Sequence, residues 1–307
     1  MNQSRRKFVV RSLLLSLAYP LYLYAQQSDQ PGIPQSNDAT GEAKGDAEFE
    51  QAFASLRQKA IDFYSGLGYQ PIDRKALLTG HAFNGGLRYD ESGTASTGSE
   101  RSMIIQDCAR IGDIGEQHRH DILPYFHILG CNARSRNDDA QIVKEILDFL
   151  LGPVGLAPQR LAFVSVERLS TYRQLLAEHG IDWQRQVVIR DTDAAKAVGD
   201  GSGHFRPAGH PEQPDQPSVG IYAWLGEGPV PAVHSYPLPA QWSELGEIGL
   251  GPDSESIHGV GLERLVYATT GLLPSWHDRR EHLLARIEAE VAASGGSLPE
   301  GYYLFKG

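Results

Sequence analysis

Apolar residues recur at three- and four-residue intervals near the start of the chain. They are Phe49, Phe53, Leu56, Ala60, Ile61 and Tyr64. This spacing places the side chains on one face of a helix, so it predicts an amphipathic α-helix that ends at Gly66 and Gly68. We therefore expect the folded domain to begin near Ala47 and to continue to residue 307.

Two short apolar runs after this helix predict a β-hairpin. Met103–Arg110 and Tyr125–Gly130 flank a polar stretch, and residues 80–100, rich in Gly, Ser and Thr, precede them as an expected loop. Such runs around a polar segment are typical of two antiparallel strands with a long connection.

The rest of the chain mixes helix and strand patterns. A helix capped by Asp138 is predicted from an apolar face made of Ile142, Val143, Ile146, Leu147 and Leu150. Further expected elements are a strand at Leu161–Val166, a helix at Ser170–His179, a strand at Gln186–Ile189, a loop at 199–218, a strand at Val219–Leu225, one or two strands within Val233–Ile248 and a helix at Gly261–Thr270. Hairpins in place of regular strand–helix–strand alternation predict an α+β fold with an antiparallel sheet flanked by helices.

The segment before this domain has the pattern of an export signal. Arg5 and Arg6 precede Phe8 and an apolar run, and Ala25 is a small residue before the expected cut. The paired arginines resemble the twin-arginine signal of bacteria. This predicts a leader at 1–25, a periplasmic mature chain and no membrane span after cleavage, with an uncleaved anchor or an accidental basic start as alternatives. Residues 26–46, rich in Gln, Ser, Asp, Gly and Pro, are expected to be a disordered linker.

Charge and cysteine content narrow the classes of function. A net charge of −10 over 307 residues disfavours a broad nucleic-acid surface. Cys108 and Cys131 are too few for a metal-type cysteine cluster, and they are either bridged or two buried thiols. The histidines are scattered and show no helix-spaced pair, so no zinc site is expected.

The candidate chemistry lies in two segments. Gly259-Val-Gly261-Leu-Glu-Arg264 puts two glycines before an apolar helix and an arginine in its first turn. That arrangement suits phosphate oxygens, although a helix start with a surface arginine has the same pattern. In the hairpin, Arg110 ends one strand, and Tyr125 and Phe126 begin the other. An arginine for phosphate and an aromatic ring for a base form a two-sided clamp.

These segments resemble motifs 2 and 3 of class II aminoacyl-tRNA synthetases, and most of all the alanyl-tRNA synthetase branch, over about residues 50–275. The resemblance implies that Arg110 binds the α-phosphate of ATP and Arg264 the γ-phosphate. It implies that Tyr125 or Phe126 stacks on adenine, since strand alternation lets only one face the site. Gly259 and Gly261 let backbone approach the ligand. Glu244 or Glu247 is a candidate ligand for Mg²⁺ or, equally, a surface carboxylate.

The departures from the family pattern bear on substrate and partners. The aspartate that holds the substrate amino group in the alanyl branch is Ile257 here, a Trp-Asn pair has become Leu245-Gly246, and the motif 2 glutamate is His127. The connection before Tyr125 is also shorter than in the family. Since a buried cation needs a countercharge, alanine bound in the usual way is not expected. We expect no tRNA-recognition, editing or oligomerisation region, so the chain is not expected to act as a tRNA synthetase.

The resulting hypothesis is a tRNA-independent enzyme that uses ATP and Mg²⁺ to activate an amino acid or related carboxylate. The alternative is an exported synthetase-like fold that binds a ligand or acts as an accessory protein without ATP chemistry. A hydrolase or transferase that uses the same site has no supporting nucleophile motif. A homodimer stays open as a partner, because class II cores usually dimerise.

Overall fold

The computed structural model describes residues 39–79, 82–83, 101–114, 122–133, 139–205, 216–250, 256–299 and 301–306. The chain divides into two compact units, Met1–Gly41 and Glu42–Gly307. Apart from the first residues of one helix, every described element belongs to the second unit. The predicted leader at 1–25, the linker before residue 39, most of the loop at 80–100 and the cap at Asp138 lie outside the described residues.

A nine-stranded sheet forms the centre of this unit, in the order β1-β4-β5-β11-β10-β9-β6-β7 with β8 on β9. Its strands are β1 (Gln70–Pro71), β4 (Arg101–Ala109), β5 (Tyr125–Ala133), β6 (Leu161–Ser165), β7 (Val187–Ile189), β8 (His204–Phe205), β9 (Gln216–Trp224), β10 (Trp242–Gly249) and β11 (Ser256–Gly261). Neighbours are antiparallel except for the β1–β4 and β6–β7 pairs, which are parallel. The predicted α+β class is confirmed, with a mixed rather than purely antiparallel sheet. A separate small hairpin pairs β2 (Leu78–Thr79) with β3 (Ala82–Phe83).

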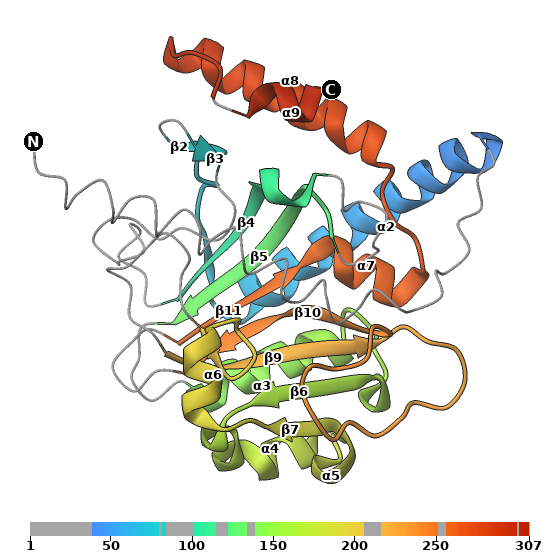
Figure 1. The fold of residues 1–307 in the computed structure, drawn as a ribbon, viewed down its shortest axis with the longest axis vertical. Helices are drawn as coiled ribbons and strands as arrows, with labels where there is room; N and C mark the ends of the chain where they lie inside the picture. Colours follow the sequence, from blue (N-terminus) through green and yellow to red (C-terminus); the bar gives the residue numbers. More distant parts are fainter. Residues whose placement is uncertain are drawn as a thin grey trace, which may run out of the picture. The chain divides into compact units, whose positions relative to one another are not determined.

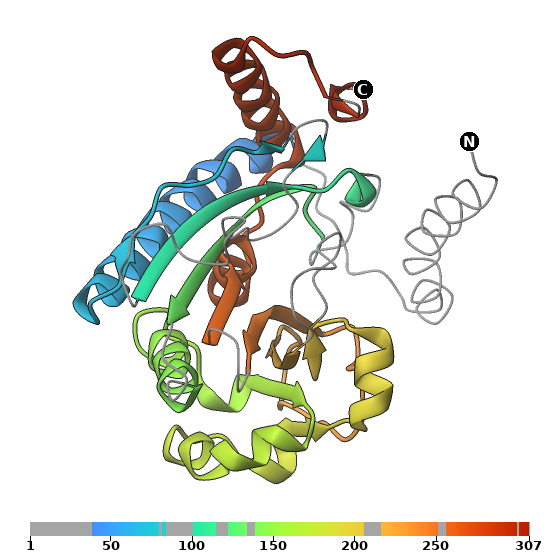
Figure 2. The same ribbon diagram turned by 90° about the vertical axis from the view of Figure 1, so that its left-hand side faces the viewer.

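The described helices are α2 (Ala39–Gly66), α3 (Asp139–Leu151), α4 (Arg173–Glu178), α5 (Trp183–Gln186), α6 (Thr192–Val198), α7 (Leu262–Thr270), α8 (Trp276–Ser294) and α9 (Tyr302–Lys306), with 3-10 turns at Ile111–Asp113, Pro158–Arg160 and Glu167–Tyr172. In Figures 1 and 2, α2 lies along one face of the sheet, and α6 lies on the other side. Among the described residues, no helix is long and apolar enough to cross a membrane.

One face of the sheet packs against α2, α3 and α7, and we call it the helix-covered face. Leu129 and Cys131 of β5, Val260 of β11 and Ile221 of β9 point into this core together with apolar residues of those helices. Because successive side chains of a strand alternate, the residues between these point to the other side, here called the open face. Phe126 and Gly259 lie on the open face by this alternation.

Several predicted elements are confirmed, and some differ. The hairpin of β4 and β5 is present, and the apolar side chains predicted for the face of α3 are buried. The helix that becomes α2 begins at Ala39 rather than near Ala47, so it includes residues 39–46 of the expected linker. Ala39, Ala43 and Lys44 favour a helix, and Asp46 ties it down by accepting a hydrogen bond from Ser275 N at 2.9 Å.

The C-terminal helices were missed, although Leu283, Leu284, Ile287 and Val291 of α8 recur at helical spacing and pack into one core. A second core of Leu77, Ala109, Tyr125, Leu283, Ile287, Tyr302 and Phe305 joins α8 and α9 to the ends of β4 and β5. α8 is charged over most of its surface. Its position depends on tertiary contacts, which a local pattern does not reveal.

Gly246 is required by the backbone of the sheet. A Cβ atom at this position would lie 2.0 Å from Gly259 O and 2.7 Å from Val260 Cα. The register also shifts on β10 between Glu244 and Gly246, where a bulge brings β10 close to β11. The Leu245-Gly246 pair therefore has a structural cause: Leu245 is fully buried, and Gly246 leaves no room for a side chain.

We predict that Gly246→Ala lowers the free energy of unfolding by about 1–3 kcal/mol, because backbone atoms would have to move. Urea unfolding followed by circular dichroism measures the change. Gly112→Ala is the matched control, since a Cβ there meets nothing within 4 Å. Equal stability of the two variants would contradict the close approach of β10 and β11.

Candidate functional site

Arg110 and Phe126 meet at the open face. Arg110 follows the last residue of β4, and its backbone N–H donates to Pro124 O at 2.8 Å, which closes the hairpin end. Phe126 lies opposite Cys108 in the β4–β5 register. The guanidinium carbon of Arg110 lies 4.7 Å from the centre of the Phe126 ring. An arginine and an aromatic face are thus held side by side, as the hairpin pattern predicts.

Tyr125 lies on the helix-covered face. Its side chain is 6% exposed and packs in the core with Ala109, Leu283 and Ile287. Burial raises the pKa of Tyr125 to about 12, and the nearby Asp107 carboxylate adds to the rise. Of the two predicted aromatic residues, the structure therefore brings only Phe126 to the side of Arg110.

Arg264 lies at the start of α7 and reaches across to β10. It donates from Nη1 to Glu244 O at 3.0 Å and to the Glu244 carboxylate at 3.1 Å. A Cβ at Gly261 would lie 3.4 Å from Arg264 Cδ, so the arginine passes directly over this glycine. A Cβ at this distance would make an ordinary van der Waals contact, so the path of the arginine does not require glycine at position 261.

Glu247 lies on the same face, where Arg110 and Glu244 act on its carboxylate. It pairs in register with Gly259 of β11, and Gly259 in turn pairs with Gly130 of β5. Burial raises the pKa of Glu247 to about 8; the Glu244 carboxylate adds to the rise, and Arg110 opposes it. The electrostatic influence of Arg110 and Glu244 on one carboxylate places these groups near each other.

The predicted residues thus gather on the open face of three adjacent strands, β5, β11 and β10. Two arginines, two carboxylates, one aromatic ring and two glycines face the same side. In such an arrangement the arginines can bind a phosphate ligand and the carboxylates can bind Mg²⁺ together with that ligand. Mg²⁺ is usually held by one or two carboxylates and by substrate phosphates. Among the described residues, no group of three or more His, Cys, Asp or Glu could hold a metal ion without such help.

A glycine-rich loop at residues 199–203 borders Glu247 and was missed as part of the site. Gly199, Gly201 and Gly203 all have positive φ angles, of 67°, 85° and 109°. A Cβ at Gly201 would lie 2.0 Å from the Glu247 Oε2 atom, so only glycine lets this loop reach the carboxylate. The alternating glycines of residues 199–203 are the feature of the sequence that could have indicated a close approach of this loop to the site.

Three side chains hold this loop in place. Arg190 donates to Asp200 at 2.8 Å and stacks on the Tyr236 ring at 4.2 Å. Tyr236 donates its hydroxyl to the other Asp200 oxygen at 2.9 Å. Ser202 and Tyr222 share a hydroxyl–hydroxyl hydrogen bond of 2.6 Å. The loop is therefore fixed by polar contacts to β9, to the residue that follows β7 and to the connection between β9 and β10.

A buried charge network lies behind the site, on the helix-covered face. Glu263, 1% exposed, accepts hydrogen bonds from the His127 backbone N–H at 2.9 Å and pairs with the His127 ring at 2.8 Å. Arg279 of α8 adds an ion pair to Glu263 at 3.3 Å. Burial opposes ionisation of Glu263, but His127 and Arg279 outweigh it and lower the pKa. His127 therefore binds the residue next to Arg264.

A second arginine of α8 neutralises a carboxylate below the hairpin. Asp107 is 1% exposed and lies three residues before Arg110 on the chain. Arg286 reaches it at 3.0 Å, and Arg74 lies 3.7 Å away. α8 thus supplies the countercharge for buried carboxylates near both candidate arginines.

The two cysteines are free and buried. Cys108 lies opposite Phe126, whereas Cys131 lies opposite Met103, five residues further along β4. At about 3.4 Å per residue, this is roughly 17 Å along the strand, well beyond what a disulfide spans. Burial raises the pKa of the Cys108 thiol to about 12, so it is a poor nucleophile. Of the two alternatives, the structure contains two buried thiols.

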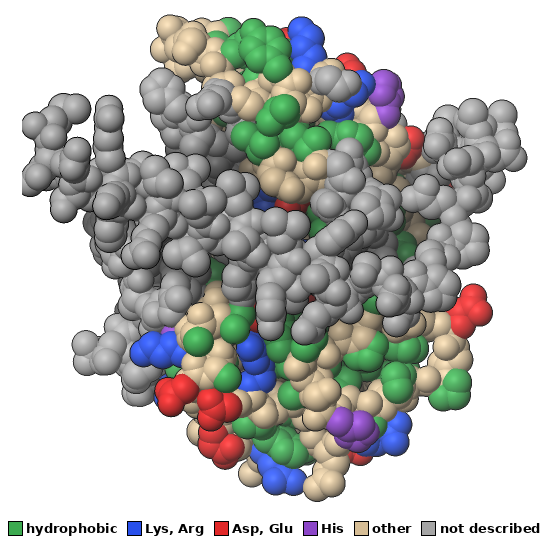
Figure 3. All heavy atoms as spheres, in the orientation of Figure 1, with side chains coloured by type: hydrophobic (Ala, Val, Ile, Leu, Met, Phe, Trp, Pro, Cys, Tyr) green, Lys and Arg blue, Asp and Glu red, His purple; other side chains and the backbone are tan. Residues whose placement is uncertain are grey.

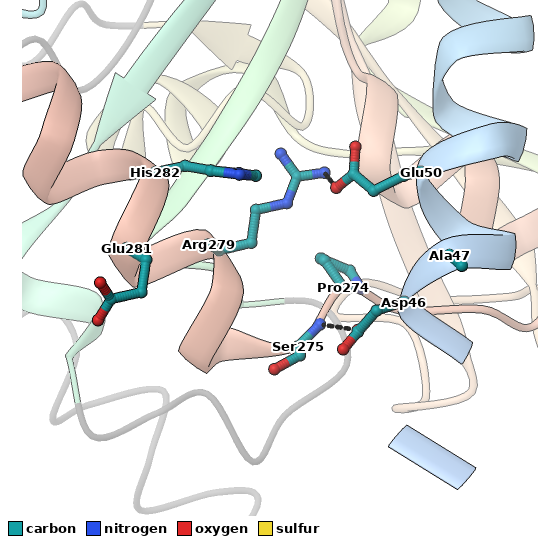
Figure 4. Close-up of a pocket in the computed structure, with 8 residues that line it drawn as sticks. All are labelled: Asp46, Ala47, Glu50, Pro274, Ser275, Arg279, Glu281 and His282. Atoms are coloured by element: carbon teal, nitrogen blue, oxygen red, sulfur yellow. Dashed lines mark hydrogen bonds and ion pairs between the residues drawn. The ribbon is translucent and has the colours of Figure 1, made fainter. Parts of the chain in front are cut away.

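A pocket of about 230 Å³ lies at the N-terminal ends of α2 and α8, away from the predicted residues. Figure 4 shows Arg279 reaching from α8 toward Glu50, with His282 on one side. Asp46 and Glu50 make its α2 wall acidic. None of the residues predicted for the site lines it.

The surface of the described residues does not contain a broad basic area in the view of Figure 3. Basic and acidic side chains are interspersed there, as the net charge of −10 leads one to expect.

No protein-family model matches the chain, and no curated protein sequence matches it. Aspartyl-tRNA synthetase from Entamoeba histolytica is a similar solved structure, with 9% identity and a TM-score of 0.42 over 81% of this chain and 62% of that one. Pyrrolysyl-tRNA synthetase from Desulfitobacterium hafniense has 13% identity and a TM-score of 0.43, covering 81% and 86%. Asparaginyl-tRNA synthetase from Pyrococcus horikoshii, complexed with asparaginyl-adenylate, has 13% identity and a TM-score of 0.36, and the match covers 75% of this chain and 66% of that one. Likeness at this level assigns neither activity nor substrate.

Proposed function

We propose that the domain is a class II synthetase-like core of the alanyl type that activates a carboxylate with ATP, without tRNA. The observation that carries this proposal is the arrangement of Arg110 with Phe126, and of Arg264 with Glu244, on one face of three adjacent strands. Two separated arginines suit the phosphates of a triphosphate, and the Phe126 ring beside Arg110 suits a base.

In this proposal each residue has a defined part in the reaction. A substrate carboxylate oxygen attacks the α-phosphorus of ATP, the bond to the β-phosphate oxygen breaks, and pyrophosphate leaves with the electron pair. Arg110 binds the α-phosphate, where charge develops, and Arg264 binds the terminal phosphate that departs. Phe126 stacks on adenine. The products are an acyl-adenylate and pyrophosphate.

The carboxylates fit Mg²⁺ only together with the nucleotide. Glu244 is 34% exposed at its side chain and already beside Arg264, so it offers oxygen ligands next to the expected phosphate. The described residues supply too few donors for the ion alone. When bound, Mg²⁺ would neutralise phosphate charge. We therefore assign this part to Glu244.

We predict that ATP with Mg²⁺ raises the melting temperature of the chain, and that Arg110→Ala and Arg264→Ala each abolish the rise. At 100 times the dissociation constant a ligand adds about 2.7 kcal/mol, which is roughly 5–10 °C for a domain of this size. Arg57→Ala is the control, because Arg57 is exposed on α2. A rise that persists in both site variants would refute the proposed nucleotide site.

The second candidate function is an exported protein that binds a ligand or partner without ATP chemistry. The paired Arg5-Arg6 before an apolar run supports it, since ATP is scarce outside the cytoplasm. We propose that residues 1–25 direct twin-arginine export to the periplasm. Replacing both arginines by lysine should retain the precursor in the cytoplasm, as cell fractionation would show. Export of the variant at the same level as the original precursor would remove the support for this second function, and the ATP-dependent enzyme would stay as the proposed function.

A further inference from the structure

A thioether, a thiol and an imidazole form a row across the helix-covered face of the sheet. In the strand register, Cys131 of β5 lies opposite Met103 of β4 on one side and opposite His258 of β11 on the other. Met103 and Cys131 are part of the core on this face, and His258 shares the face because it alternates with the core residue Val260. The three side chains are therefore direct neighbours on three adjacent strands.

The imidazole of this row is buried without a partner. Met103, Cys131 and His258 are all buried, and His258 has no exposed surface. Neither ring nitrogen of His258 has a hydrogen-bond partner among the described residues. A neutral imidazole has one donor and one acceptor nitrogen, and folded proteins rarely leave both unpaired in the interior.

Tyr64 of α2 packs against the row and also lacks a polar partner. Its ring lies 5.2 Å from the His258 ring, and its buried hydroxyl has no hydrogen-bond partner in the described part of the chain. By contrast, the nearby Glu145 carboxylate accepts hydrogen bonds from Tyr69 at 2.7 Å and from Arg101 at 2.7 Å. The lack of partners thus belongs to the side chains around the row and not to this core as a whole.

Water is the alternative partner for these groups, but the composition of the row favours a soft metal ion. A water molecule would bind His258 and Tyr64, whereas the sulfur atoms of Met103 and Cys131 are weak hydrogen-bond acceptors. Thiolate and thioether sulfur are the ligands that select soft ions such as Cu⁺, and imidazole binds the same metal.

The burial of the row decides the charge of the ion. Cu⁺ bound to a single thiolate is electrically neutral, so it needs no counter-ion in the interior, whereas a divalent ion would leave a positive charge. Glu145 acts electrostatically on Cys131, but it is already paired with Arg101 at 2.7 Å. Within the described residues, no third His, Cys, Asp or Glu joins Cys131 and His258. A monovalent ion therefore fits these ligands better than a divalent one.

We propose that Met103, Cys131 and His258 bind a Cu⁺ ion in the core of the domain, at a site separate from the proposed nucleotide site. The Cβ atoms of directly opposite residues lie about 5 Å apart. An ion on the Cys131 sulfur is therefore within reach of the imidazole and of the flexible thioether chain after changes of rotamer. On binding, the S–H bond of Cys131 breaks, the S–Cu bond forms and the proton leaves to solvent, with no change in oxidation state.

The ion joins β4, β5 and β11 on the face opposite Arg110 and Phe126. It therefore stabilises the strands that carry the proposed nucleotide site. Because the row is buried under α2, binding of the ion is coupled to folding or to local opening of this core.

The test measures copper in the full chain by two routes. The chain is produced in medium with added copper and purified without oxygen, and the copper-free chain is titrated anaerobically with Cu⁺ against a competing chelator. We expect about one copper ion per chain, sulfur and nitrogen ligands in X-ray absorption, and a melting temperature raised by roughly 5–10 °C. Cys131→Ala and His258→Leu should each lower the affinity for Cu⁺ by more than about 100-fold. Met103→Leu should lower it less, because the thioether is uncharged.

Cys108→Ala is the matched control, because Cys108 is also a buried thiol but lies opposite Phe126, away from the row. Copper bound by the unaltered chain and by Cys108→Ala, but by neither Cys131→Ala nor His258→Leu, supports the inference. Copper retained in the latter two variants, equal affinity for Zn²⁺, or no copper in the unaltered chain by either route overturns it.

A second measurement does not depend on the folding of any variant. X-ray absorption of the unaltered chain identifies the ligand atoms directly, and nitrogen and oxygen ligands without sulfur overturn the inference. His258→Leu should also fold, since it removes two unpaired polar atoms from the core and should be at least as stable as the copper-free chain. Circular dichroism and urea unfolding verify this.

Discussion

Replacing Arg279 by methionine should lower the free energy of unfolding by about 3–5 kcal/mol, because it removes the ion pair between Arg279 and the buried Glu263 carboxylate, which then depends on His127. Arg279 is 4% exposed, pairs with Glu263 at 3.3 Å and lies 5.0 Å from the centres of the Phe49 and Phe53 rings. Methionine keeps most of the apolar contact and removes the charge. Thermal and urea unfolding measure the loss, expected at roughly 10 °C or more.

The neighbouring arginine of the same helix is the control. Arg280 pairs with Glu281 at 3.9 Å, where the glutamate side chain is 60% exposed, so Arg280→Met should cost less than about 1 kcal/mol. In the double variant Glu263→Gln with Arg279→Met, part of the loss should return, because no buried charge is left. A loss of the same size in the double variant as the sum of the single ones would show that charge pairing is not the cause.

The consequence for function follows from the position of Glu263. It precedes Arg264 directly, and Arg279 and His127 fix it from α8 and β5. In a variant that stays folded at the assay temperature, a weaker hold on the first turn of α7 should weaken ATP binding. Such a change, measured well below the melting temperature, separates positioning of Arg264 from stability alone.

The sequence predicted the hairpin and the glycine–arginine segment because their signals are local. Arg110 beside one of the two rings, Tyr125 or Phe126, follows from strand alternation and hairpin pairing alone. Contact between Arg264 and Glu244 depends on the order β11-β10, which no local pattern gives. The same is true of Glu247, whose neighbours Gly201 and Asp200 come from a loop that precedes it by more than forty residues.

The choice between Tyr125 and Phe126 needed the C-terminal helices. Alternation states that only one ring faces the site, but not which one. Leu283 and Ile287 of α8 pack against Tyr125 and settle the matter. The apolar residues Leu283, Ile287 and Val291 of α8 do have helical spacing, so the helix itself could have been predicted, whereas its two ion pairs to buried carboxylates of α7 and β4 depend on tertiary contacts.

Alanine is expected to be a poor substrate in ATP–pyrophosphate exchange. Its kcat/KM should be about two to four powers of ten below that of the best substrate. Under the proposed alanyl-type arrangement, Ile257 takes the place of an acidic partner for the ammonium group, and the loss of a buried charge partner costs about 3–5 kcal/mol. Position 246 cannot supply the missing acidic partner, because a Cβ atom there would lie 2.0 Å from Gly259 O. Exchange should be compared for alanine, glycine, serine, longer amino acids and amine-free acids. Strong exchange with alanine, and with none of the other acids, would contradict this prediction.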